Sequence, residues 1–219
     1  MKKTVQETVE QLEVNIDRWK AEGKFDDKTE ALVYAKPTRL EFETDMIRAL
    51  LGGETIFDNC SFLHSEFKKT QVVEYLTGSF GQSGKRSLLI LGGVGAGKTS
   101  GMLAYMVSQM HLAQAGAFIT AYDLAMMIHK KDFEGLDRIS KRRYLAIDDL
   151  GTEPQGFKGK DFLAHFENLF SERHRKMLYT FITCNGKVDD VKENYGERFA
   201  SRFQQYGEVF ETTDGDMRK

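Results

Sequence analysis

The chain has 219 residues, of which 41% are hydrophobic and 29% charged, with a formal net charge of −2. This length fits one domain with a small additional element. No apolar run is long enough to cross a bilayer, the N-terminus lacks the apolar core of a signal peptide, and the two cysteines, Cys60 and Cys184, are too few for a disulfide framework or a zinc site. We therefore expect a protein of the reducing cytoplasm with no membrane partner.

Residues 1–54 read as an acidic helical region. Apolar residues at steps of four and three predict one amphipathic helix over 1–24, and shorter helices follow at 27–35 and 38–51. The region holds nine Lys/Arg and twelve Asp/Glu, whereas the remainder holds 22 and 21. Phosphate contacts need cations, so a protein partner suits this region better than nucleic acid. The first helix either binds such a partner or packs on its own domain.

A glycine-rich loop follows a short buried strand at Leu88–Leu91. The sequence G-G-V-G-A-G-K-T and the helical pattern after it match the strand–loop–helix arrangement of a phosphate-binding loop. The alternative is a glycine-rich turn that binds nothing, and it is disfavoured because both the motif and its context fit. Lys98 supplies a charge for the outer phosphates of ATP, and the Thr99 hydroxyl can ligate Mg²⁺. The predicted nucleotide-binding residues are Gly92, Gly93, Val94, Gly95, Ala96, Gly97, Lys98, Thr99 and Ser100.

The rest of the chain alternates strand and helix patterns, which is typical of a parallel α/β sheet. Apolar runs predict strands at 117–120, 178–183 and 209–211, and helical periodicity predicts helices at 66–76, 122–129 and 160–175. Residues 78–86 read as a loop leading into the strand before the phosphate loop.

Another apolar strand, which begins at Tyr144, ends in Asp148 and Asp149. A parallel sheet would bring these carboxylates beside the phosphates. There Asp148 can hold Mg²⁺, directly or through water, and Asp149 can orient or deprotonate the attacking water. The alternative, a strand followed by a polar turn, is less favoured after a phosphate loop. Asn185 follows the 178–183 strand and either contacts the water or γ-phosphate, or forms an ordinary asparagine–glycine turn.

Four segments in this order resemble the AAA+ ATPases of the bacterial helicase-loader group, which includes DnaC, DnaI and the IstB transposition ATPase: G-G-V-G-A-G-K-T, Y-L-A-I-D-D-L-G-T-E-P, F-I-T-C-N and G-E-R-F-A-S-R-F. The resemblance covers roughly residues 55–218. It implies a three-layer α/β phosphate-loop fold with Asn185 as sensor 1. It also implies Arg202 as an arginine finger acting in trans, with Arg198 as the competitor, and Arg218 as a second sensing arginine. A finger in trans makes hydrolysis depend on assembly.

The chain departs from the group in several ways. Asp149 stands where many AAA+ proteins carry glutamate, so hydrolysis is expected to be slow. Residues 1–54 lack the cysteines of a DnaI-type zinc module, and we expect no C-terminal lid domain. The basic clusters 129–131 and 141–143 either bind single-stranded DNA or form a solvated face, and Tyr122 and Phe133 are available for stacking on bases.

We therefore expect an N-terminal helical partner-binding arm, 1–54, and an AAA+ ATPase domain, 55–219. The expected function is ATP-dependent loading of a hexameric replicative DNA helicase by a homo-oligomer that forms with ATP and Mg²⁺ on single-stranded DNA. Two alternatives share the site: an IstB-like transposition ATPase, and a nucleotide-switched protein-binding module with little turnover.

Overall fold

The computed structural model describes residues 38–53, 56–64, 67–110, 115–154 and 160–217, without the side chains of residues 160, 161, 198 and 202. The chain divides into two compact units, Met1–Thr38 and Arg39–Lys219. The helices predicted at 1–24 and 27–35 lie outside the described residues. Within the described ranges, no helix has the length and apolar character needed to cross a membrane.

A parallel sheet forms the centre of the second unit. Its five strands run in the order β2-β3-β4-β1-β5, and every pairing is parallel. The strands are β1 (Ser87–Gly92), β2 (Gly116–Thr120), β3 (Tyr144–Leu150), β4 (Tyr179–Asn185) and β5 (Glu208–Glu211). All six residues of β1 are buried, as expected for a strand covered by helices on both faces. The predicted α/β sheet is confirmed.

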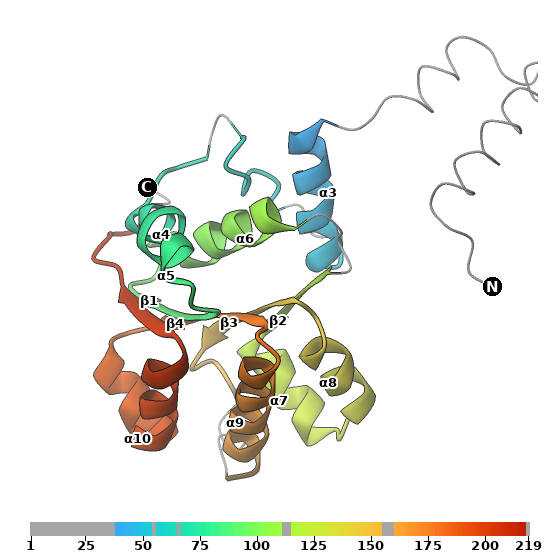
Figure 1. Cartoon of the computed structure of the whole chain (residues 1–219), viewed down its shortest axis with the longest axis vertical. Helices are drawn as coiled ribbons and strands as arrows, with labels where there is room; N and C mark the ends of the chain where they lie inside the picture. The colour runs from blue at the N-terminus through green and yellow to red at the C-terminus, as the bar shows by residue number, and fades with distance from the viewer. Residues whose placement is uncertain (1–37, 54–55, 65–66, 111–114, 155–159, 218–219) are drawn as a thin grey trace, which may run out of the picture. The chain divides into compact units, whose positions relative to one another are not determined.

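Helices form a layer on each face of the sheet (Figure 1). One layer contains α3 (Arg39–Leu50), α4 (Gln71–Tyr75) and α6 (Lys98–Gln109), and the other contains α7 (Ala121–His129), α9 (Lys160–Arg175) and α10 (Val188–Tyr206). Successive strand residues point to opposite faces. Thus Leu88 and Ile90 pack in the core of the first layer, and Leu89 and Leu91 in that of the second.

Two helical segments differ from the sequence prediction. The helix predicted at 66–76 begins at Gln71, where the Thr70 hydroxyl accepts the Val73 N–H at 3.3 Å, and it continues through a π-helical turn (η1, Leu76–Phe80) into α5 (Gly81–Ser83). The predicted loop at 78–86 is therefore partly helical, because the buried Leu76 and Phe80 extend the core contact. In addition, α8 (Phe133–Ser140), which the sequence did not predict, is capped by Asp132.

The predicted helix at 38–51 corresponds to α3, which packs within the same unit as the sheet. Met46 and Ile47 are buried in one core cluster with Leu88 and Met106. Full burial of such a side chain stabilises a fold by about 1.5–3 kcal/mol. The compact unit therefore begins at Arg39, ahead of the domain boundary predicted after residue 54. A partner-binding role for the preceding residues stays a prediction.

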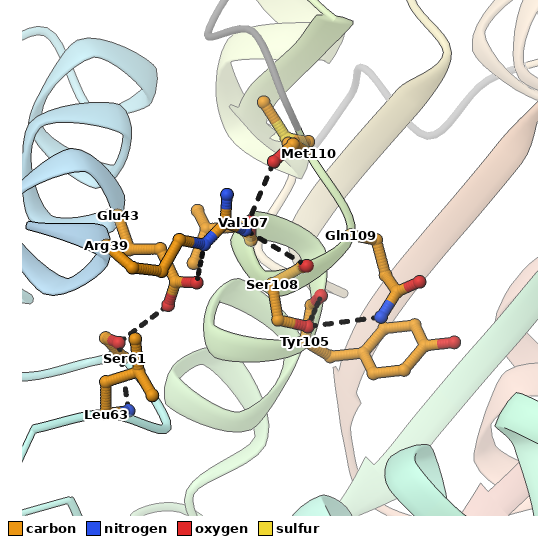
Figure 2. Close-up of polar contacts among 9 residues, drawn as sticks. All are labelled: Arg39, Glu43, Ser61, Leu63, Tyr105, Val107, Ser108, Gln109 and Met110. Atoms are coloured by element: carbon orange, nitrogen blue, oxygen red, sulfur yellow. Dashed lines mark hydrogen bonds and ion pairs between the residues drawn. The ribbon is translucent and has the colours of Figure 1, made fainter.

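Arg39, the first residue of α3, caps the C-terminal end of α6 (Figure 2). Its Nη2 donates at 3.1–3.2 Å to three backbone carbonyls, those of Val107, Ser108 and Met110. The carbonyls at the C-terminal end of a helix carry the negative end of the helix dipole, so a cation stabilises them. Arg39 Nε also donates to Glu43 at 2.7 Å, and the buried Glu43 accepts from Ser61 Oγ at 2.7 Å. The network joins α3, α6 and the segment before α4.

Candidate nucleotide-binding site

The predicted phosphate loop connects the end of β1 to the start of α6. Gly92, Gly95 and Gly97 have φ values of 147°, 79° and 75°, a region that favours glycine. A Cβ atom at Gly97 would lie 2.8 Å from Thr70 Cγ2, and one at Gly92 would lie 2.4 Å from Thr212 Cγ2. Gly92 and Gly97 therefore need glycine for both backbone conformation and space, and Gly95 needs it for backbone conformation.

Lys98 lies at the N-terminus of α6 with its ammonium group among oxygen acceptors. Its Nζ donates to the carbonyl oxygens of Gly92 at 3.1 Å and Gly93 at 2.7 Å, and to Asn185 Oδ1 at 2.9 Å. Burial lowers the pKa of Lys98, while the charges of Asp149 and Asp148 oppose that shift. Lys98 and Asn185, predicted from separate motifs, are thus in direct contact.

Asp148, near the end of β3, contacts the residue that follows Lys98. Thr99 Oγ1 donates to Asp148 Oδ1 at 2.8 Å, and Thr183 Oγ1 on β4 donates to the same oxygen at 2.5 Å. Burial raises the pKa of the Asp148 carboxyl, while the two hydroxyl donors oppose that shift. A hydroxyl beside a carboxylate fits a hard cation such as Mg²⁺.

The Thr99 hydroxyl and the Asp148 carboxylate fit the way in which proteins usually bind Mg²⁺. In the part of the chain that the structure describes, no group of three or more His, Cys, Asp and Glu residues is arranged to hold a metal ion. Mg²⁺ commonly binds one or two protein ligands and completes its shell with phosphate oxygens and water. Thr99 and Asp148 would therefore hold the ion together with a bound nucleotide.

The backbone of Asp149 does not have the extended conformation of a β-strand. Its φ is 54°, and the pairing of β3 with β4 shifts register between Ile147 and Leu150. A non-glycine residue in this conformation costs on the order of 1–3 kcal/mol. The Asp149 N–H is held by Thr183 Oγ1 at 2.9 Å, so Thr183 links the backbone of Asp149 to the carboxylate of Asp148. An irregularity of this kind redirects a side chain, and Asp149 lines the cavity described next.

A cavity of about 530 Å³ lies over the phosphate loop. This volume falls in the common range of small-molecule sites, about 300–1,000 Å³. Loop residues 94–101, Asp149 and Asn185 form one part of its wall. The segment before α4 forms another part, with Ile56, Phe57, Asn59, Cys60 and Phe67. The sequence did not predict this second wall. Its phenylalanines indicate an apolar contact, but they do not recur with the period of a helix or a strand, so the sequence does not show what they contact.

The C-terminal segment after β5 lies against the phosphate loop. Thr212 N donates to Leu91 O at 2.9 Å, and Met217 N donates to Gly95 O at 3.0 Å. Met217 also lines the cavity, and its carbonyl accepts from Lys68 at 2.6 Å. The chain therefore returns to the loop directly before Arg218.

The structure brings together five of the predicted site residues: Lys98, Thr99, Asp148, Asp149 and Asn185. Ser100 lines the same cavity. Arg198 and Arg202 lie on α10, but their side chains, like the whole of Arg218, are outside the described residues. The roles predicted for these three arginines stay predictions.

Comparison with solved structures places the fold. The chain matches the DnaC helicase loader with a TM-score of 0.52 and 18% identity over 71% of this chain and 97% of that one. AMPPCP-bound DnaA from Aquifex aeolicus matches with a TM-score of 0.53 and 18% identity, over 72% and 54%. DnaI matches with a TM-score of 0.50 and 22% identity, over 67% and 80%. No protein-family model matches the sequence, and no curated protein does either.

The chain therefore has the α/β fold of AAA+ ATPase cores, with the strand order β2-β3-β4-β1-β5. Within that fold it is structurally similar to DnaC, DnaI and DnaA, and it spans about half of the matched Aquifex aeolicus DnaA chain. At these identities the likeness establishes the fold, and the predicted resemblance to the AAA+ group is confirmed at that level.

Proposed function

We propose that this protein is an AAA+ ATPase that binds ATP at the cavity over the phosphate loop. One observation carries the proposal: residues from three separate sequence motifs meet there through hydrogen bonds. Lys98 contacts Asn185 at 2.9 Å, and Thr99 contacts Asp148 at 2.8 Å. Sheet geometry alone does not require a lysine, a hydroxyl, a carboxylate and an amide to converge at one edge. Phosphate binding with Mg²⁺ uses all four.

The residues have distinct roles in hydrolysis. The backbone of Gly92–Ser100 and the Lys98 ammonium bind the phosphates, and Arg218 contacts the same nucleotide. Thr99 and Asp148 hold Mg²⁺, which neutralises charge on the phosphates when bound. Asp149 orients a water and accepts its proton as the water oxygen attacks the γ-phosphorus and the bond to the ADP oxygen breaks. Asn185 positions this water, and Arg202 of a neighbouring copy stabilises the charge of the transferring group.

We further propose that ATP turnover loads a hexameric replicative DNA helicase. The order of the four motifs and the shared fold with the DnaC helicase loader and DnaI support this role. The acidic residues 1–54 contact the helicase, and ATP-bound copies assemble into a homo-oligomer. Because α3 belongs to the sheet unit, we assign the proposed helicase contact to the residues before Arg39.

Single-stranded DNA is the second proposed partner. The residues of the 129–131 cluster are exposed, and Tyr122 and Phe133 are 47% and 59% exposed. In the 141–143 cluster, Lys141 pairs with Asp137 at 2.6 Å. An exposed ion pair of this kind contributes only about 0–1 kcal/mol, so it does not prevent a phosphate contact. Phosphate binding by the clusters and base stacking on the two rings would together hold a flexible strand.

Two experiments test these proposals. ATP turnover is measured with and without single-stranded DNA, and the immobilised full chain is offered a hexameric helicase or a transposase. We expect turnover that DNA alters and ATP-dependent capture of the helicase. Capture of the transposase instead would favour the IstB-like alternative. ATP binding without measurable turnover under either condition would favour a nucleotide-switched module.

A further inference from the structure

Glu153 and Tyr195 form a buried polar contact near the proposed catalytic turn. Glu153 is 4% exposed and follows the Asp149–Gly151 turn closely in the chain. The Tyr195 hydroxyl lies 2.7 Å from Oε1 and 2.8 Å from Oε2 of its carboxylate. The Gly151 N–H donates to Oε1 at 3.3 Å. One carboxylate therefore binds both its own turn and a side chain of α10.

Tyr195 lies at the point where α10 changes direction. The next residue, Gly196, has φ 85° and ψ 154°, which interrupts the helix. Arg198 and Arg202 belong to the part of α10 after this kink. Beyond the kink, Phe199 packs with Phe166 of α9 at a ring distance of 5.2 Å. Tyr195 is thus the polar anchor at the base of the segment that carries both candidate arginine fingers.

The chemistry of the Glu153–Tyr195 pair is better suited to holding these residues in a defined position than to stabilising the fold. Desolvating a carboxylate costs several kcal/mol, and an apolar pair of similar volume often packs at no such cost. Burial and the Glu153 carboxylate raise the pKa of Tyr195, so its hydroxyl remains a donor throughout the physiological pH range. A hydrogen bond between fixed atoms specifies distance and direction, whereas apolar contacts specify them loosely.

We propose that Glu153 and Tyr195 are positioning residues that couple each subunit's own Asp149 turn to the arginine segment it presents to its neighbour. This inference rests on the proposed function, because it needs Asp149 to act on ATP in cis and an arginine of α10 to act in trans. Through the Tyr195–Glu153 bond, the turn that holds the water-orienting carboxylate sets the orientation of α10 after its kink. Adjacent ATP sites are then linked through the interior of one subunit.

The first test separates turnover from ATP binding. We expect Tyr195→Phe and Glu153→Ala to keep the ATP dissociation constant within about twofold and to lower kcat by about 10- to 100-fold, the size of effect that a small misplacement produces. Glu153→Gln retains an acceptor oxygen and should restore most of kcat. The double variant Tyr195→Phe, Glu153→Ala should be no worse than Glu153→Ala alone, since Glu153→Ala already removes the bond to Tyr195 together with the Gly151 contact. Wild-type kcat in Tyr195→Phe would overturn the inference.

A matched control removes a tyrosine hydroxyl elsewhere. Tyr144 is 5% exposed and donates to Gln109 O at 3.2 Å, at the opposite end of β3 from the site. Tyr144→Phe should leave kcat unchanged. If Tyr195→Phe does not fold, Tyr195→Phe with Glu153→Gln removes the bond without leaving a buried charge, and a wild-type kcat in that variant would equally overturn the inference.

Subunit mixing tests the effect on the neighbour. Lys98→Ala mixed with Arg202→Ala should regain activity, because an intact site meets an intact arginine. Tyr195→Phe mixed with Arg202→Ala should regain about tenfold less, because the arginine comes from a subunit without the bond. Failure of the first mixture contradicts the proposed finger in trans. Equal recovery in both mixtures contradicts only the coupling proposed for Tyr195.

Discussion

Lys98 at the start of α6 and Asn185 at the end of β4 are in direct contact, with the ammonium nitrogen 2.9 Å from the amide oxygen. β1 and β4 are parallel neighbours, and Gly92 lies opposite Asn185. The contact therefore follows from the order of strands in the sheet. A terminal phosphate held by Lys98 would lie within reach of the Asn185 amide.

Lys98→Ala should weaken ATP binding by about 100-fold or more. Charge-assisted hydrogen bonds contribute about 1.5–3 kcal/mol each, and every 1.4 kcal/mol is tenfold in affinity. Calorimetric titration with ATP measures the change. Lys176→Ala is the control, because Lys176 is exposed and pairs with Glu172 at the end of α9. Wild-type affinity and turnover in Lys98→Ala would show that the site is assigned to the wrong residues.

Asp149→Asn should bind ATP normally and lose about 10²- to 10⁴-fold in turnover, since the attacking water loses its proton acceptor. Single-turnover phosphate release measures the chemical step. Glu153 is a poor substitute base, because its carboxylate is buried and contacts Tyr195. Full turnover in Asp149→Asn would transfer the role to another acceptor.

Arg202→Ala should bind ATP normally and hydrolyse it slowly, since arginine fingers contribute about 10³- to 10⁵-fold in rate. Because Asp149 replaces the glutamate that many AAA+ proteins carry, the baseline is expected to be low and the measured loss smaller. Wild-type turnover per subunit should also rise with protein concentration. Recovery in mixtures of Lys98→Ala with Arg198→Ala, but not with Arg202→Ala, would identify Arg198 as the finger. Turnover independent of concentration and no recovery in either mixture would indicate a monomeric switch.

Neutralising the 129–131 and 141–143 clusters should weaken binding to single-stranded DNA and flatten its salt dependence. Each lost phosphate contact lowers the slope of log affinity against log salt by about 0.7. Fluorescence anisotropy with a labelled oligonucleotide over a salt series gives this slope, with Lys176→Gln as the surface control. If the slope does not change, the clusters form a solvated face.

Arg173→Met should destabilise the fold by at least about 3 kcal/mol, since each buried acceptor that loses its partner costs about 1–3 kcal/mol. Arg173 is fully buried, and its guanidinium donates at 2.5–3.1 Å to the carbonyls of Ile139, Ser140, Arg142 and Tyr179 and to Thr180 Oγ1. Burial lowers its pKa to about 10, which leaves it charged at neutral pH. Urea denaturation measures the loss, and the exposed Arg175→Met is the control. Equal midpoints would contradict a structural role.

The sequence by itself determined the phosphate loop and the strand that ends in Asp148 and Asp149. Both are local patterns. The loop is a set of glycines at positions of positive φ between an apolar run and a helix, and the strand is an apolar run that ends in two carboxylates. Helix ends were less well predicted. Capping by Thr70 set where the helix predicted at 66–76 begins, and the burial of Phe80 extended it beyond residue 76.

Only the tertiary structure decided which distant residues meet. Thr183 contacts Asp148, Asn185 contacts Lys98 and Tyr195 contacts Glu153 because β4 pairs with both β1 and β3 and α10 packs beside them. The same holds for the pocket wall before α4 and for the docking of α3 through Met46 and Ile47. Strand order and helix docking depend on contacts between elements far apart in the chain, and the periodicity of one segment does not encode them.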